Sequence, residues 1–476
     1  MATVFGPSIL DESQKKAIRE YKYRGGDMSI LYKHVLSPMA QYFVDAWTPP
    51  TIAPNMITAI GLMFNLTALV LTLIYDPTLT AAPRWLSFVS GWCVVIYQTL
   101  DNMDGKQARK IGASSPLGLL FDHGCDAIVS GISAITLGSV FGAGWTATGL
   151  FTCWVSSFFT FYMATWEEFY LHEMWLPIVN GASEGIVMVF GACMCSAYYG
   201  SGWWQEPSIA IPFFHRSLPK LFPFQILIAQ TMGIVMPGIV AQMCKVMYKL
   251  YTETGVPTHV RMANFRRALG GLVLVVTFVV STFLWCFVSK AFADARHGLA
   301  LYMVTAFVEI ATHLMLMHTS SGQVSNGLGR ITAWVSLLLP LNSFHGNYTN
   351  VYLKCMSYLS ISNLVTYFTV TNRGAIAGND INFALTPLVD EVALVNVLAV
   401  VSALYTFVVG YRHVIALADT LDVYIFFLGK PSKDKAAAAA ASKKKSRAAS
   451  AFDSPVPVGT RRSARSRSGA RSSPKK

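Results

Sequence analysis

The stretch "LDNMDGKQARKIGASSPLGLLFDHGCD" runs from Leu100 to Asp126 and contains four aspartates and one histidine: Asp101, Asp104, Asp122, Asp126 and His123. Apolar segments flank it, residues 85–100 before and residues 127–141 after. The aspartates form one pair three residues apart and one pair four residues apart, so on helices the members of each pair share a face. The short turn at 110–116 lets two helices return antiparallel, which predicts that the four carboxylates converge where these helices end.

A cluster of four carboxylates beside apolar segments needs compensating charge. On insertion scales even one acidic residue at the centre of a bilayer costs about 2.5–3.5 kcal/mol. Divalent cations remove this cost, and a site made only of oxygen ligands favours Mg²⁺ or Mn²⁺. Four carboxylates can hold two such ions about 3.5–4 Å apart, the arrangement used for in-line phosphoryl displacement. The sequence therefore predicts that all four aspartates are metal ligands.

The neighbouring residues suit a phosphate ligand. Gly105, Ala108 and Gly118 are small enough for a ligand or a facing helix to come close. Lys106 and Arg109 can meet phosphate oxygens, and Arg109 can do so with both arms of its guanidinium group. The alternative is a set of helix-end charges with a basic cytoplasmic loop. That alternative explains any one residue, but the complete set favours a phosphate site.

The composition indicates a polytopic, all-α integral membrane protein. Of 476 residues, 53% are hydrophobic and only 13% are charged, whereas soluble domains carry about 25% charged residues. Apolar runs near 20 residues long recur along the chain. We expect about ten transmembrane helices, with residues 331–372 forming one helix plus a re-entrant piece, or two helices. The other expected spans are near residues 57–75, 85–105, 117–142, 146–165, 184–200, 224–246, 268–294, 299–318 and 390–413.

The expected spans and the charge distribution divide the chain into three regions. We expect residues 1–55 to form an amphipathic, cytoplasmic or interfacial N-terminal segment, residues 56–428 the transmembrane catalytic domain, and residues 429–476 a basic cytoplasmic tail. From residue 430 onward the tail has fourteen Lys/Arg and two Asp, which equals the +12 net charge of the whole chain. It has almost no large apolar residues, so we expect it to be disordered. It is either a solvated tail or an attachment to anionic lipid, and no nucleic-acid partner is expected.

The loop charges predict the orientation. With an even number of helices both chain ends share a side, and the basic tail places that side in the cytoplasm. The loop after the second helix then faces the cytoplasm and contains Lys106, Arg109 and Lys110, as the positive-inside rule requires. The aspartate cluster should therefore open toward the cytoplasm.

The chain resembles the CDP-alcohol phosphotransferases. The spacing Asp101-x2-Asp104-Gly105-x2-Ala108-Arg109-x8-Gly118-x3-Asp122-x3-Asp126 is similar to the signature of that family at every fixed position. "YKYRGGD" at 21–27, "APN" at 53–55 and "TWEEFY…NGASEGI" at 165–186 resemble the eukaryotic choline and ethanolamine phosphotransferases in particular. The resemblance covers roughly residues 20–420.

The resemblance implies an activity. Such enzymes transfer phosphocholine or phosphoethanolamine from CDP-choline or CDP-ethanolamine to diacylglycerol or alkylacylglycerol, and release CMP. It implies a membrane enzyme of the endoplasmic reticulum or Golgi. Relatives often pair as dimers, and the sequence does not decide whether this chain forms a homodimer. The alternatives are another alcohol, such as inositol, or an ion transporter with an intramembrane acidic site.

The resemblance also implies residue roles. The four aspartates hold two Mg²⁺ ions against the CDP pyrophosphate. Asn55, which could instead cap a helix, reaches the nucleotide. Gly112 lies in the nucleotide region, where relatives often carry a side chain. The general base is either His123 or Asp126. We favour His123, because a carboxylate that ligates a dication is a weak base, whereas imidazole titrates in the useful range.

Several acidic residues are candidates for the cationic head group. Glu167, Glu168 and Glu184 lie near the expected cytoplasmic ends of the fourth and fifth helices. Trp166 could add a cation–π contact, which quaternary ammonium favours, or could belong to an interfacial aromatic belt. We expect His313 to be a packed or interfacial histidine.

Overall fold

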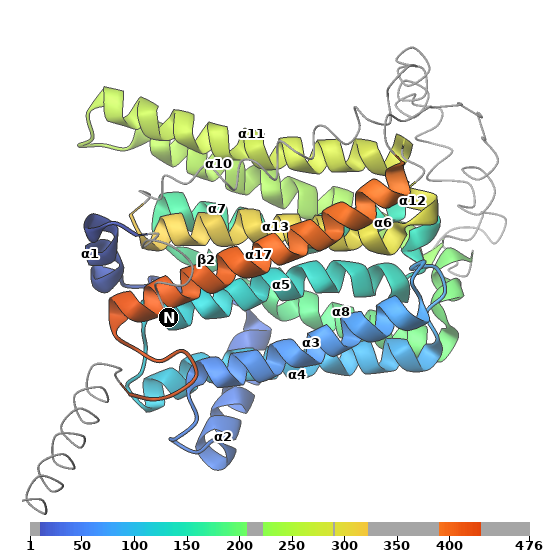
Figure 1. Ribbon diagram of the computed structural model, residues 1–476, viewed down its shortest axis with the longest axis horizontal. Helices are drawn as coiled ribbons and strands as arrows, with labels where there is room; N and C mark the ends of the chain where they lie inside the picture. The colour runs from blue at the N-terminus through green and yellow to red at the C-terminus, as the bar shows by residue number, and fades with distance from the viewer. Residues whose placement is uncertain (1–9, 207–221, 289–290, 322–389, 430–476) are drawn as a thin grey trace, which may run out of the picture. The chain divides into compact units, whose positions relative to one another are not determined.

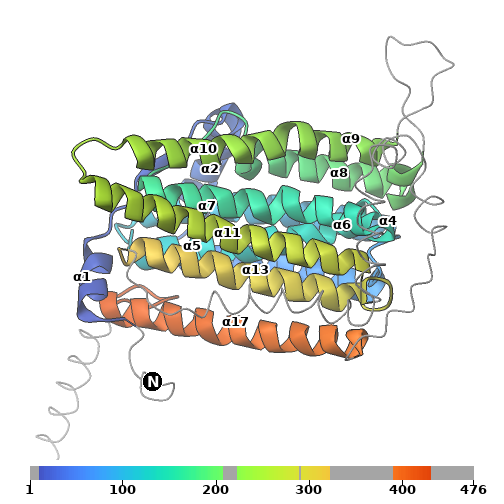
Figure 2. The ribbon, with the colours of Figure 1, turned by 90° about the horizontal axis from the view of Figure 1, so that it is seen from above.

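The computed structural model describes residues 10–206, 222–288, 291–321 and 390–429. Within this part of the chain almost every element is a helix, and the described residues up to Leu428 form one compact unit. The exception is a short parallel pair of strands, β1 (Gly25–Asp27) and β2 (Met174–Leu176), which the sequence-based expectation of a purely helical fold did not include. The long helices run side by side, as Figures 1 and 2 show.

Six helical stretches of the described chain are long and apolar enough to cross a membrane. Their mean hydropathies lie between 1.2 and 2.4. They confirm the predicted polytopic membrane class, although they do not fix the total number of spans. The six are α3 (Pro54–Tyr75), a π-turn at Gly181–Gly185 followed by α8 (Ile186–Tyr199), α9 with α10 (Pro223–Gln230 and Met236–Thr252), α11 (Thr258–Val288), α13 (Arg296–Thr319) and α17 (Glu391–Leu421).

The remaining long helices carry the signature. They are α4 (Arg84–Lys110), α5 (Pro116–Val140) and α6 (Ala147–Trp154), which continues through the π-turn Val155–Phe159 into α7 (Thr160–Leu171). Several boundaries differ from the prediction. Helix α4 continues to Lys110 rather than ending near residue 105, α11 begins at Thr258 rather than near residue 268, and α17 ends at Leu421 rather than near residue 413. Helices α7 and α10 also end later than predicted, at Leu171 and Thr252. A separate short helix, α12 (Ala291–Asp294), follows α11. The helix and re-entrant piece expected at 331–372 lie outside the described residues.

The signature helix α5 lies at the centre of the packing. It contacts α3, α4, α6 and α13, and Figure 1 shows it between α13 and the α3–α4 pair. The helix is buried on more than one face, because Ala127, Ile132 and Ala134 are each at most 1% exposed. Gly131 permits the close approach of α13, because a Cβ atom there would lie 2.5 Å from Cγ1 of Val304. This burial fixes the rotation of α5 and hence the direction of its acidic residues.

The N-terminal segment covers the ends of the helices near the signature. Helix α1 (Glu12–Glu20) is capped by Asp11 and lies against α17, where Arg19 Nε donates to the Thr420 carbonyl at 3.1 Å. Asp27 of β1 accepts hydrogen bonds from Asn180 Nδ2 at 2.9 Å and Ser183 Oγ at 2.7 Å. A π-turn (Tyr32–Leu36) and α2 (Ser37–Trp47) then lead back to α4. These contacts hold residues 21–29 beside the functional site.

Candidate metal centre

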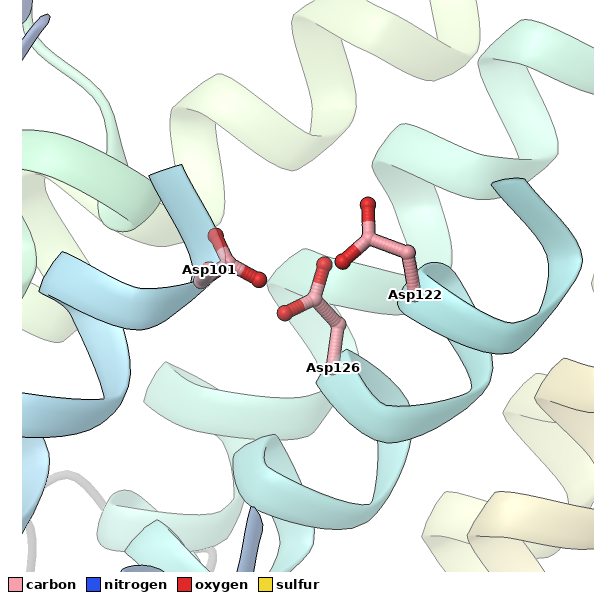
Figure 3. A group of neighbouring side chains, drawn as sticks. All are labelled: Asp101, Asp122 and Asp126. Atoms are coloured by element: carbon pink, nitrogen blue, oxygen red, sulfur yellow. The ribbon is translucent and has the colours of Figure 1, made fainter. Parts of the chain in front are cut away.

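Three carboxylates converge between α4 and α5. Figure 3 shows Asp101 of α4 pointing toward Asp122 and Asp126 of α5. One ligand oxygen from each residue lies within 4.8 Å of the others. We call these residues the three-carboxylate cluster. The local sequence builds it directly, because Ser115 caps α5 by accepting from the Gly118 amide at 3.1 Å, and Pro116 occupies the first turn.

Asp104 lies beside the cluster without belonging to it. Its carboxylate is 7% exposed and accepts a hydrogen bond from the hydroxyl of Thr58 on α3. Three residues along a helix correspond to about 300° of rotation, so Asp104 is turned about 60° from Asp101 around the axis of α4. The structure therefore brings three of the four predicted ligands together and directs the fourth toward α3.

The cluster has the properties that a hard divalent cation requires. Oδ1 of Asp101 and Oδ1 of Asp122 are buried, and neither has a hydrogen-bond partner among the described residues. Tyr97 donates to Oδ1 of Asp126 at 2.7 Å. None of the ion pairs in the described part of the chain involves these carboxylates. Half-buried carboxylates that have buried, unpaired oxygens and no basic partner among the described residues fit a divalent metal ion.

Asn55 belongs to the first turn of α3 and lies next to the first turn of α5. Helix α3 begins at Pro54 with Ala53 as its N-cap, so the alternative role of Asn55 as a helix cap is wrong. Its Nδ2 donates to the Ile425 carbonyl at 2.9 Å, and its Oδ1 would lie 3.6 Å from a Cβ atom at Gly118. Asn55 and Gly118 are therefore neighbours.

The basic residues of α4 point in different directions. Arg109 is exposed, and its Nη1 would lie 3.5 Å from a Cβ atom at Gly105. Lys106 donates to Ser37 of α2 at 2.8 Å, so it holds α2 against α4 in this structure.

The end of α4 involves two of the predicted small residues. The carbonyl of the half-buried Ala108 accepts a hydrogen bond from the Ala113 amide just beyond the helix. Gly112 has φ of +67°, a left-handed conformation that explains glycine at this position.

His123 lies beside the cluster and lines a separate pocket. No atom of His123 belongs to the three-carboxylate cluster, although the residue follows Asp122 directly. It lines a small pocket together with Tyr21, Glu168 and His318, which we call the His123 pocket. The ring of Tyr23 meets the His123 ring edge-on, with centroids 6.2 Å apart. Burial, with the carboxylates of Glu168 and Asp122, raises the pKa of Tyr23 to about 12, so its hydroxyl stays protonated at neutral pH.

The residues predicted as candidates for head-group binding have different surroundings in the structure. Glu167 forms an ion pair with Lys245 of α10, and Trp166 is fully buried near Gly271 of α11. Glu184 accepts hydrogen bonds from the Ser29 hydroxyl and the Asn180 amide. Only Glu168 lines the His123 pocket. His313, expected to be packed or interfacial, does not line that pocket either.

Five residues near the site were not predicted from the sequence: Thr58, Tyr97, Tyr21, Tyr23 and His318. A signal existed for Tyr97, which precedes Asp101 by four residues and so shares its helix face. A similar signal existed for Thr58, one turn after Asn55. Helical spacing gave no signal for Tyr21, Tyr23 and His318, because their contacts join segments far apart in sequence.

Comparison with known proteins identifies the family. A family model described as CDP-alcohol phosphatidyltransferase matches residues 51–200, which include the cluster. The chain is 37% identical over 310 residues to choline/ethanolaminephosphotransferase 2 of Arabidopsis thaliana, covering 63% of this chain and 76% of the relative. It is 43% identical over 200 residues to choline/ethanolaminephosphotransferase 1 of the same plant, covering 42% and 50%. It is 37% identical over 193 residues to choline/ethanolaminephosphotransferase 1 of Saccharomyces cerevisiae, covering 40% and 49%. The chain therefore belongs to the CDP-alcohol phosphatidyltransferase family.

Proposed function

We propose that this membrane protein transfers phosphocholine or phosphoethanolamine from CDP-choline or CDP-ethanolamine to diacylglycerol or alkylacylglycerol. The products are phosphatidylcholine or phosphatidylethanolamine, or their ether analogues, together with CMP. The observation that carries this proposal is the convergence of Asp101, Asp122 and Asp126 within the segment matched by the family model. The names of the relatives support the head groups. An inositol-transferring enzyme and an ion transporter are not favoured.

The cluster would hold Mg²⁺, or Mn²⁺, with Asp104 next to it for a second ion. When bound, the metal spreads the negative charge of the CDP pyrophosphate and of departing CMP. Tyr97 fixes the orientation of Asp126 through its hydrogen bond. Asn55 and Gly118 border the nucleotide side, and the exposed Arg109 can pair with a phosphate.

His123 is the proposed general base. It takes the proton from the hydroxyl of the lipid acceptor, and the freed oxygen attacks the β-phosphorus. Asp126 is the alternative base, but it carries the hydrogen bond from Tyr97 and belongs to the metal cluster, so proton removal is better assigned to His123. The position of His123 next to Asp122, with its ring outside the cluster, supports this division of roles.

The two substrates reach the site from different phases. Diacylglycerol is soluble in the bilayer that the apolar helices span, whereas the CDP-alcohol is soluble in water. The basic residues Arg109 and Lys110 at the end of α4 favour a cytoplasmic opening of the site, in the endoplasmic reticulum or Golgi. This assignment places the water-soluble substrate where the exposed Arg109 lies.

Purified protein in detergent tests the proposal. Diacylglycerol and Mg²⁺ are supplied with CDP-choline, with CDP-ethanolamine, or with neither nucleotide, and lipid products and CMP are both measured. We expect phospholipid and CMP to appear together only when a CDP-alcohol is present. The Asp122→Asn variant is the matched inactive control. Wild-type protein that binds a CDP-alcohol but forms neither product would contradict the proposed activity.

A further inference from the structure

The His123 pocket is lined by both polar and apolar side chains. Its polar lining includes Tyr21 of the N-terminal segment, His123 of α5, Glu168 of α7 and His318 of α13. Leu119 and Met315 contribute apolar surface. The space between these side chains admits about one water-sized group. Four separate segments of the chain thus meet around a small space next to the cluster.

Glu168 is the unusual member of this pocket. Its side chain is 4% exposed, and the one basic group paired with it in the described residues is His318, whose Nε2 lies 3.7 Å from the carboxylate. That same nitrogen is 3.0 Å from the hydroxyl of Tyr21. The nearby acids differ, because Glu167 pairs with Lys245 and Glu173 pairs with Lys249. A neutral His318 leaves the Glu168 carboxylate buried without a cation, which is unfavourable.

The pocket adjoins the place where the pyrophosphate of a CDP-alcohol would bind. His123, in its wall, follows Asp122 of the cluster directly. Tyr23 contacts the His123 ring and lies within the electrostatic influence of both Glu168 and Asp122. In CDP-ethanolamine and CDP-choline only two carbons separate the nitrogen from the phosphate oxygen. A cationic head therefore stays near its pyrophosphate, and Glu168 is the acidic residue that lines the pocket next to Asp122.

We propose that Glu168 binds the ammonium group of CDP-ethanolamine in the His123 pocket and makes ethanolamine the preferred head group. This inference rests on the proposed function, and it adds a preference between the two head groups and the residue that binds the ammonium group. A primary ammonium is similar to water in size and has three N–H donors. The carboxylate of Glu168 and the hydroxyl of Tyr21 accept such bonds, and Nδ1 of His318 is buried without a hydrogen-bond partner among the described residues. Trimethylammonium is larger and has no N–H donor.

Binding measurements on purified protein separate the head group from the nucleotide. CDP-ethanolamine, CDP-choline and CDP are titrated against wild type, Glu168→Gln and Glu173→Gln. Glu173 is a suitable control because it is a half-exposed acid close to Glu168 in sequence. We expect Glu168→Gln to weaken CDP-ethanolamine binding by about 10–100-fold, as for the loss of a charged hydrogen bond. Its affinity for CDP should match that of wild type, which also shows that the variant is folded.

The size of the pocket is tested by a second variant that retains the carboxylate. Leu119→Ala enlarges the apolar wall, so it should raise kcat/KM for CDP-choline relative to CDP-ethanolamine. Wild type itself should have the higher kcat/KM with CDP-ethanolamine. A wild-type preference for CDP-choline, or equal CDP-ethanolamine affinity in wild type and Glu168→Gln, would overturn the head-group assignment while leaving the transferase activity intact. Absence of turnover with both CDP-alcohols in wild type would instead overturn the proposed function.

Discussion

Tyr97 of α4 donates a hydrogen bond of 2.7 Å to Oδ1 of Asp126 on α5, and so joins the two helices that carry the cluster. The tyrosine is 2% exposed, which leaves its hydroxyl little alternative to this carboxylate. Such a bond fixes the direction of a metal ligand, and losing it typically costs 10–100-fold in metal affinity or activity. The structural relationship thus connects helix packing to the proposed metal chemistry.

The Tyr97→Phe variant tests this connection. We expect the Mg²⁺ concentration for half-maximal transferase activity to rise by about 10–100-fold, because Asp126 loses the bond that orients it. The measurement is a Mg²⁺ titration at saturating CDP-alcohol. Tyr75→Phe, at an exposed position at the end of α3, serves as the control and should leave the titration unchanged. A Tyr97→Phe enzyme with the wild-type Mg²⁺ requirement would show that this bond does not support a metal ligand.

Chelation and single carboxylate replacements test the metal site itself. We expect excess EDTA to abolish turnover and added Mg²⁺ or Mn²⁺ to restore it. Asp101→Asn, Asp122→Asn and Asp126→Asn should each lose most activity while retaining the fold, because each removes an anionic ligand without changing side-chain size. Asp45→Asn is the control, because Asp45 is an exposed aspartate outside the cluster, and its ion pair with Lys110 is long, at 3.9 Å. Full turnover in EDTA, with metal content measured, would exclude a metal-dependent reaction.

Asp104 lies outside the three-carboxylate cluster, so its replacement tests whether a second ion binds beside that cluster. Its hydrogen bond comes from Thr58, so Asp104→Asn and Thr58→Val should both impair the enzyme if this carboxylate holds a second ion. We expect the Asp104→Asn loss to be large and the Thr58→Val loss to be smaller, with a raised Mg²⁺ requirement. The two Mg²⁺ titrations check this order. Normal activity in Asp104→Asn would reduce the site to the three converging carboxylates.

The positions of the helices and of the cluster could be predicted because their signals are local. Apolar runs near 20 residues long predicted the spans, and the aspartate spacings predicted shared helix faces. The three-residue spacing gives the rotation between Asp101 and Asp104, but it could not predict that Thr58 of another helix donates a hydrogen bond to Asp104 outside the cluster. It also could not predict the contact of Tyr21 with His318, which are 297 residues apart. Such contacts depend on how helices pack rather than on periodicity.

The dependence on helix packing also explains why the sequence could not distinguish between Glu167 and Glu168 as head-group candidates. On the sequence alone, Glu167 and Glu168 are equivalent neighbours near the end of a helix. Successive helical residues differ in direction by about 100°, so only the packing of α7 decides which glutamate faces inward. Glu167 meets Lys245 of α10, whereas Glu168 lies against His318 of α13. The roles of Glu167 and the other substrate residues remain predictions.

Removal of the basic tail tests the predicted division of the chain. Because residues 430–476 carry the whole net charge and almost no large apolar residues, truncation after Gly429 should leave specific activity in detergent unchanged. On vesicles containing anionic lipid, truncation should weaken membrane association most at low salt, since salt screens surface charge. Vesicle flotation across a salt series measures this. A folded but inactive truncated enzyme would place the tail within the catalytic unit.

His123→Ala separates the two candidate bases. The change removes the imidazole but retains every carboxylate of the cluster, so CDP-alcohol binding and the Mg²⁺ requirement should stay near wild type. We expect kcat to fall by about 10²–10⁴-fold, the usual contribution of a general base. His259→Ala, at an exposed position on α11, is the control. Asp126→Asn should behave differently, because extra Mg²⁺ should partly restore an enzyme whose defect is metal binding. If His123→Ala turns over normally while Asp126→Asn binds metal and is inactive, then Asp126 is the base and His123 only lines its pocket.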